Sequence, residues 1–197
     1  MAKSLQGKRV AMLVENGFEQ IELTEPRNAL HEAGAKAEVV SPVDGKVKGW
    51  NFTDWGEEVP VDTPLDQADP DAYDALVLPG GVMNPDKLRM NPRAREFVKA
   101  FFRAGKPVAV ICHGPWTLID AGVVAGRKIT SYPSLANDLR NAGAEWVDEE
   151  VVVDNGLVSS RRPDDLPAFT SKMIEEFAEG RHERRATETK GGADLPL

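Results

Sequence analysis

The chain has 197 residues, 41% hydrophobic and 28% charged, with a net charge of −8 at pH 7. These values predict one folded domain with a sizeable core, and the acidic charge argues against nucleic acid or an anionic membrane as partner. A single cysteine excludes an internal disulfide and favours the cytoplasm, and no stretch is long and apolar enough for a membrane span or signal peptide.

Short apolar runs alternate with segments of helical periodicity along most of the chain. Such runs are typical of strands that are buried on both faces. Strands are expected at 8–15, 35–42, 73–79, 106–112 and 127–132. Helices are expected at 19–33, 92–104, 113–122, 134–144 and 164–180, the last capped by Asp164 or Asp165 and ended by Gly180.

Two segments interrupt this alternation. Residues 45–68 contain two tryptophans and several acids, and short strands or a hairpin at a sheet edge are expected there. Residues 150–161 form two β-rich runs around Asn155-Gly156, the pair favoured in a tight type I′ turn, and predict a β-hairpin.

The order of the elements predicts an α/β fold with a mostly parallel sheet, helices on both faces, and a C-terminal β-hairpin and helix. Residues 1–180 are expected to form a single domain. The composition of the tail, residues 181–197, is typical of a disordered segment.

The single cysteine, Cys112, lies where a predicted strand ends and a helix begins. Ligands bind at the carboxyl ends of parallel strands, and so tight a turn resembles a nucleophile elbow. The start of a helix also favours thiolate, so we expect a lowered thiol pKa and a nucleophilic role, with His113 as its base. The alternatives are that Cys112 is a small core residue and that His113 points elsewhere.

Several segments together resemble the PfpI-type proteins of the ThiJ/PfpI superfamily over roughly residues 8–177. They are "AVICHGP", "YDALVLPGG", "FEQIELTEP", "AGRKITSYPS", "NAGAEWVDEEVVVD" and "LVSSRRPDDLPAF". The resemblance implies a flavodoxin-like three-layer sandwich and an assembly of dimers or of larger dimer-based rings. It implies no metal and no organic cofactor.

The resemblance also implies roles for two acids in the first helix. Glu22 matches a family glutamate that is hydrogen-bonded to the cysteine sulfur, and a carboxyl kept protonated by burial can stabilise thiolate or sulfinate. Glu19, one turn earlier, can line the same pocket. The alternative is that both are solvated acids offsetting the helix dipole.

Other site residues follow from the same resemblance. The N–H groups of Gly81 and His113 match a family oxyanion hole. Asp86 falls where the family places a triad acid supplied by a neighbouring subunit, although glutamate often stands there and this chain has one extra residue before it. From the residues alone, Asp86 is equally an acid near a helix start.

Two aromatic residues complete the expected pocket. Tyr132 stands where relatives have tyrosine or histidine, and it can close the pocket, supply a hydroxyl or only pack. Trp116 replaces an expected glutamine and alters the pocket wall.

The function expected is a cysteine-dependent stress-response hydrolase that acts on small carbonyl adducts or glycated protein, of the deglycase or glyoxalase type. A pocket one residue deep suits a small carbonyl better than an extended peptide. Two alternatives remain open: an intracellular cysteine peptidase of PfpI type, and a non-enzymatic redox-sensing stress protein or chaperone that uses oxidation of Cys112.

Overall fold

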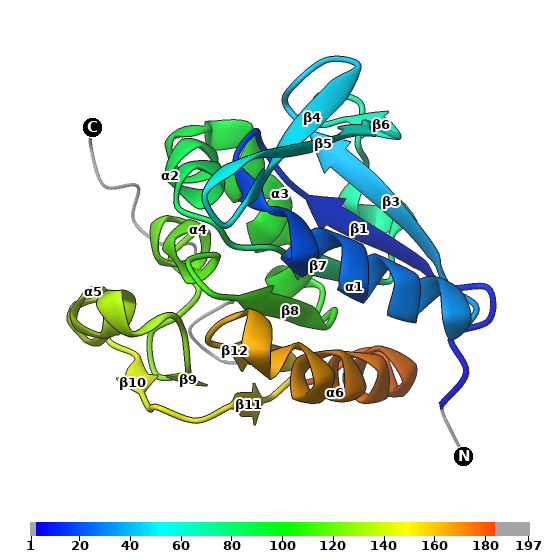
Figure 1. Cartoon of the computed structure of the whole chain (residues 1–197). Coiled ribbons are helices and arrows are strands. Elements are labelled where there is room, and N and C mark those ends of the chain that lie inside the picture. The colour runs from blue at the N-terminus through cyan, green and yellow to red at the C-terminus, as the bar shows by residue number, and fades with distance from the viewer. Residues whose placement is uncertain (1–2, 184–197) are drawn as a thin grey trace.

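The computed structural model describes residues 3–183, which are built around a seven-stranded sheet of order β11-β12-β8-β7-β1-β3-β6 (Figure 1). Every pairing in it is parallel except that of β11 with β12. Its strands are β1 (Arg9–Leu13), β3 (Lys36–Ser41), β6 (Thr63–Pro64), β7 (Ala75–Leu78), β8 (Val108–Ile111), β11 (Val151–Asp154) and β12 (Leu157–Ser160).

Helices cover both faces of this sheet. They are α1 (Gln20–Glu32), α2 (Met83–Met90), α3 (Pro92–Arg103), α4 (Pro115–Asp120), α5 (Ala136–Asn141) and α6 (Leu166–Glu179). Short 3₁₀ turns precede β7, α5 and α6, at Pro70–Ala72, Pro133–Leu135 and Pro163–Asp165.

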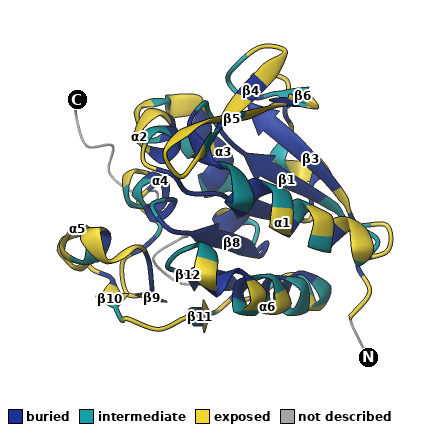
Figure 2. Ribbon diagram, viewed as in Figure 1, coloured by how far each residue is buried: buried dark blue, intermediate teal, exposed yellow. Residues whose placement is uncertain are grey.

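Two hydrophobic cores fill the space between the layers. Alternate residues of β1 point to opposite faces, so Val10 and Met12 pack in the core under α1 and α6, while Ala11 and Leu13 pack in the core under α2 to α5. Strands β7, β8 and β12 are buried throughout, and β1 and β3 are buried after their first residue (Figure 2). The expected three-layer sandwich with helices on both faces is therefore confirmed.

Residues 45–68 form a hairpin at the side of the main sheet, as expected. In it β4 (Lys46–Asn51) pairs antiparallel with β5 (Asp54–Pro60), and β4 also pairs with the short β2 (Phe18–Glu19). The β11–β12 turn is also as expected, with φ of 48° at Asn155 and 81° at Gly156.

Three details differ from the sequence-based expectations. Helix α2 was not expected, because Asn84 and Pro85 interrupt its hydrophobic pattern. Strand β10 (Glu145–Trp146) was also not expected, and it pairs with β9 (Lys128–Ile129) in a separate two-stranded sheet. Asp165 occupies the N-cap position of α6, as expected, but its side chain makes no cap hydrogen bond, because its carboxylate instead accepts hydrogen bonds of 2.9 and 3.0 Å from the Arg161 guanidinium.

The segment after α6 folds back onto the domain. The His182 N–H donates to Gly105 O (2.8 Å), and Asn155 Nδ2 donates to Glu183 O (2.8 Å). Residues 184–197 of the expected tail lie outside the described residues. Within residues 3–183, no helix has the length and apolar character needed to cross a bilayer.

Candidate active site

Cys112 sits in a strained turn between β8 and α4. Its φ is 62°, in the left-handed region that residues other than glycine rarely adopt. The backbone is held there from both sides, because Cys112 N–H donates to Ser160 O (3.1 Å) and its carbonyl accepts from Tyr132 N–H (2.9 Å). The turn also needs Gly114, where a Cβ would lie 2.9 Å from the carbonyl oxygens of Leu78 and Ile111. The backbone thus has the conformation of a nucleophile elbow.

The turn brings the Cys112 and His113 side chains together. The Cys112 Sγ lies 3.1 Å from His113 Nδ1. The His113 ring stacks on Tyr132, with centroids 4.6 Å apart, and meets the Trp116 ring edge-on at 5.3 Å. The imidazole is therefore packed against two aromatic rings, Tyr132 and Trp116.

Glu22 points from the first turn of α1 to the cysteine and is fully buried. Its Oε2 accepts a hydrogen bond from Gly80 N–H (2.8 Å), while Oε1 has no hydrogen-bond partner in the described part of the chain. Burial raises the pKa of Glu22 to about 8, so the carboxyl is protonated at neutral pH.

The environment of the Cys112 thiol differs from the sequence-based expectation. Burial raises its pKa, and an ionised Glu22 would raise it further, while the N–H groups of Gly81 and His113 lower it. Burial also lowers the pKa of His113. The expected lowering of the thiol pKa was wrong, because desolvation outweighs the end of a helix of only six residues. The resting pair is a neutral thiol beside a neutral imidazole.

The glycines before α2 allow this close packing. A Cβ on Gly80 would lie 2.5 Å from both Cys112 Cβ and Glu22 Oε2. Gly81 has a φ of 77°, and a Cβ there would lie 2.7 Å from Glu19 N. The N–H groups of Gly81 and His113 both donate hydrogen bonds toward the Cys112 sulfur. These are the two N–H groups that are expected to form the family oxyanion hole.

The two remaining acids lie in different surroundings. Glu19 is buried, which raises its pKa, and its Oε1 accepts a long hydrogen bond of 3.4 Å from Phe52 N–H in the β4–β5 hairpin. Asp86 is exposed on α2, and among residues 3–183 its carboxylate has no hydrogen bond or ion pair. Among residues 3–183, the side-chain atom that lies within hydrogen-bond distance of His113 Nε2 is Ser134 Oγ, at 3.4 Å.

Trp116 belongs to a network that the sequence did not indicate. Its Nε1–H donates to Asp138 Oδ2 (2.9 Å), and the Arg89 guanidinium lies over its ring at 5.4 Å. Arg89 in turn pairs with Asp120 at 2.6 Å. The sequence reasoning missed Ser134, Arg89 and Asp138. Gly80 carried a signal as the first glycine of "LPGG", although only Gly81 was assigned a role.

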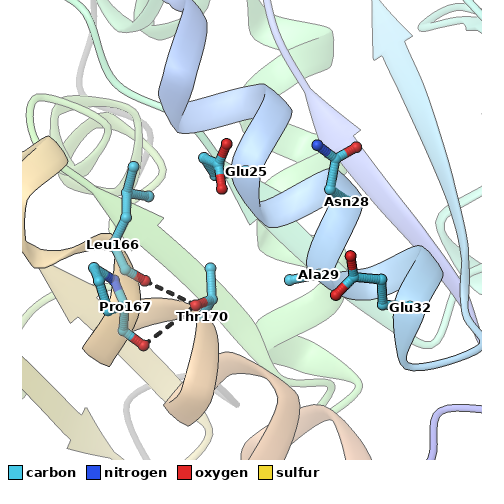
Figure 3. A pocket seen from close by; sticks show the side chains of 7 residues that line it. All are labelled: Glu25, Asn28, Ala29, Glu32, Leu166, Pro167 and Thr170. Atoms are coloured by element: carbon cyan, nitrogen blue, oxygen red, sulfur yellow. Dashed lines mark hydrogen bonds between the residues drawn. The ribbon is translucent and has the colours of Figure 1, made fainter.

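A surface groove lies away from this cysteine. It has a volume of about 160 Å³ and runs between α1 and α6 (Figure 3). Its lining residues are Glu25, Asn28, Ala29, Glu32, Leu166, Pro167 and Thr170. The Thr170 hydroxyl is already bonded to Leu166 O and Pro167 O, so the groove offers no activated nucleophile.

Among residues 3–183, no set of three potential metal-ligating side chains includes Cys112. The three side chains whose ligand atoms lie within 4.8 Å of one another are Glu176, Glu179 and His182, at the end of α6.

Comparison with known proteins places these features in a family. Residues 8–176 match the DJ-1/PfpI family. The chain belongs to this family. It is 45% identical over 166 residues to Deglycase PfpI of Pyrococcus furiosus, covering 84% of this chain and 97% of that protein. It is 46% identical over 170 residues to General stress protein 18 of Bacillus subtilis (85% and 96%), and 44% over 170 residues to Protein/nucleic acid deglycase 2 of Escherichia coli (85% and 96%).

Solved structures of the DJ-1/PfpI family share the fold. Drosophila melanogaster DJ-1beta is 29% identical with a TM-score of 0.79, covering 93% of this chain and 94% of that one. A two-domain Anabaena variabilis protein with DJ-1/ThiJ/PfpI-like and ferritin-like domains is 36% identical with a TM-score of 0.81, covering 96% of this chain and 50% of that one. Deglycases and a stress protein among the relatives support an enzymatic, stress-related role for the family.

Proposed function

We propose that this DJ-1/PfpI protein is a cysteine-dependent hydrolase of small carbonyl adducts on proteins, of the deglycase type. The observation that carries the proposal is the Cys112 Sγ to His113 Nδ1 distance of 3.1 Å in a strained turn. A buried thiol paired with a neutral imidazole is a nucleophile with its general base already in place. The names of the relatives support the same chemistry.

The attack step follows from these contacts. The C–N or C–S bond of the adduct breaks, the hydroxyl-bearing carbon becomes an aldehyde, and the amine or thiol leaves with the hydroxyl proton. The Cys112 sulfur then forms a bond to the aldehyde carbon, the electron pair of the C=O bond moves to oxygen, and the thiol proton passes to His113 Nδ1. The oxyanion accepts hydrogen bonds from the N–H groups of Gly81 and His113 and takes the proton back from the imidazolium. The hydrogen on this carbon moves to the neighbouring carbonyl carbon through an enediol, which leaves a hydroxyacyl thioester on Cys112. Water hydrolyses the thioester to the hydroxy acid and restores the thiol.

The Glu22 carboxyl stabilises the sulfur during this step. It carries no charge at neutral pH, so it does not repel a forming thiolate. Its Oε1 has no hydrogen-bond partner among residues 3–183, so a proton on this oxygen is available to the sulfur. Glu22 is thus a stabilising neighbour, and proton transfer from the thiol falls to His113.

The third member of the triad is Asp86 from a second copy of the chain. Within residues 3–183, no carboxylate is bonded to His113 Nε2, which faces Ser134 Oγ at 3.4 Å. Exposed apolar residues stand at both ends of α2, with Val82 55% and Met90 67% accessible. A homodimer, or a larger assembly of dimers, that covers this helix can place Asp86 over His113 of the neighbour.

The direct test is hydrolysis of methylglyoxal-modified N-acetylcysteine and N-acetylarginine by the purified chain. We expect turnover that is abolished in Cys112→Ser and reduced at least about 100-fold in His113→Ala. His31→Ala is the matched control, because His31 is exposed on α1. Absence of turnover in the wild type, with ready sulfinate formation in peroxide, would replace the hydrolase with the redox sensor. Cleavage of casein but not of the adducts would replace it with the peptidase.

A further inference from the structure

A second cluster of chemically active side chains lies at the carboxyl end of α6. The helix ends at Gly180, whose φ of 84° turns the chain back, so that His182 returns to the last helical turn. Its Nε2 lies 3.2 Å from Glu176 Oε2, and the ligand atoms of Glu176, Glu179 and His182 all lie within 4.8 Å of one another. We propose that these three side chains bind a divalent transition-metal cation of the Zn²⁺ type.

The buried groups in this cluster lack hydrogen-bond partners. Glu176 is only 9% exposed, and apart from His182 Nε2 at 3.2 Å, no N–H or O–H group of residues 3–183 donates a hydrogen bond to its carboxylate. His182 Nε2 is likewise buried without a hydrogen-bond partner, although Glu176 Oε2 is close by. Buried polar groups are normally satisfied. A cation between the two atoms satisfies both through their lone pairs.

The histidine is held in place by the rest of the domain. Its N–H donates to Gly105 O (2.8 Å), and a Cβ on Gly156 would lie 2.7 Å from the imidazole Cδ2. The ring therefore sits against a turn that admits it only because residue 156 is glycine. A ligand held in this way loses little conformational entropy when a metal binds.

The donor set indicates the class of cation. One imidazole nitrogen and two carboxylates suit Zn²⁺ and related transition metals, whereas Mg²⁺ and Ca²⁺ prefer oxygen ligands alone. A cationic group already lies beside the cluster, since Lys3 Nζ is 2.8 Å from Glu179 Oε1. Lys3 neutralises Glu179 in the metal-free chain and competes with the metal for this carboxylate.

The test is titration of the full-length chain with Zn²⁺ by isothermal calorimetry, in a Cys112→Ser background that removes the single thiol of the chain. We expect one site per chain, a rise in melting temperature with Zn²⁺, and no comparable response to Mg²⁺. His182→Gln and Glu179→Gln should each weaken binding at least about tenfold. Lys3→Ala should strengthen it.

The controls separate binding from folding. His31→Gln removes an exposed histidine elsewhere and should leave the affinity unchanged. Glu179 is half-exposed, so Glu179→Gln keeps the metal-free melting temperature and reports on binding even if His182→Gln unfolds. Absence of Zn²⁺ binding in the Cys112→Ser chain, or equal affinity in the Glu179→Gln variant, would overturn the proposal and leave His182 and Glu176 as an ion pair only.

Discussion

The Cys112 Sγ and His113 Nδ1 atoms lie 3.1 Å apart, although the two residues are consecutive in the chain. Side chains of neighbouring residues diverge in a regular strand. The φ of 62° at Cys112 reverses this divergence, and the rings of Tyr132 and Trp116 hold the imidazole in place. The result is a neutral acid–base pair, because burial disfavours charge on both groups.

The pH dependence of alkylation tests this neutral pair. Because burial raises the pKa of the Cys112 thiol, the rate of reaction with iodoacetamide should rise with an apparent pKa above the value of about 8.5 for an ordinary cysteine. N-acetylcysteine in the same buffers is the reference. An apparent pKa below that of the reference would show that thiolate is the resting form.

The raised pKa of Glu22 predicts a loss of stability with rising pH. The folded chain keeps the Glu22 proton up to a pKa of about 8, whereas the ordinary value is 4.5, so between these values only the folded state holds this proton. Stability from this group is complete below pH 4.5 and falls by up to about 1.4 kcal/mol per pH unit up to about pH 8. Urea unfolding from pH 4.5 to 9 measures the slope.

Glu22→Gln should remove this part of the slope, since it cannot ionise. Glu25→Gln, at an exposed position on the same helix, should keep it. Identical slopes for Glu22→Gln and the wild type would mean that Glu22 is ionised in the folded chain. Glu22→Gln should also perturb alkylation of Cys112 less than Glu22→Leu, because glutamine retains a hydrogen-bond donor.

Gly80→Ala should damage the site by steric overlap. The added Cβ would lie 2.5 Å from Cys112 Cβ and from Glu22 Oε2, so both must shift, at a cost of about 1–3 kcal/mol. We expect a lower melting temperature and lost adduct hydrolysis. Gly122→Ala is the comparison: its φ is 70°, but no atom lies within 4 Å of the new Cβ, so stability should fall while activity per folded chain persists. Full activity in Gly80→Ala would refute the tight packing.

Asp138 should act on the reaction through Trp116. Its Oδ2 accepts the indole N–H at 2.9 Å, and the indole meets the His113 ring edge-on. Asp138→Leu frees the indole, and the misplaced imidazole should lower kcat about tenfold or more and shift its pH profile. Asp138→Asn retains an oxygen acceptor and should restore most of the rate. Equal loss in both variants would assign the effect to the carboxylate charge instead.

Mixing inactive subunits tests the shared triad. Cys112→Ala and Asp86→Ala chains should each be inactive, but a mixed dimer contains one intact site. Equal mixing should therefore recover roughly a quarter of the wild-type activity. Subunit exchange must be verified with tagged chains. A mixture that exchanges but stays inactive would leave a Cys112–His113 dyad without an acid from the neighbour.

The sequence by itself determined the architecture and the position of the proposed nucleophile, Cys112. Alternating apolar runs and helical segments predicted the parallel sheet, because burial on both faces demands continuous hydrophobic strands. The Asn155-Gly156 pair predicted the β11–β12 turn, because both residues tolerate positive φ. The strand-to-helix break at Cys112 marked the sheet edge where ligands bind. All three signals are local in the chain.

Only the tertiary structure decided the electrostatics and the partners of the site. The raised thiol pKa depends on how completely the folded chain buries Cys112 beside Glu22, ninety residues away in sequence, and no local pattern encodes that desolvation. The contacts of Trp116 with Asp138 and of His113 with Ser134 join separate elements in the same way. Helix α2 escaped prediction because Asn84, polar in sequence, is buried and bonded to the carbonyls of Pro79 and Gly80. A buried polar side chain such as that of Asn84 is favourable inside a protein only when other segments supply its hydrogen-bond partners.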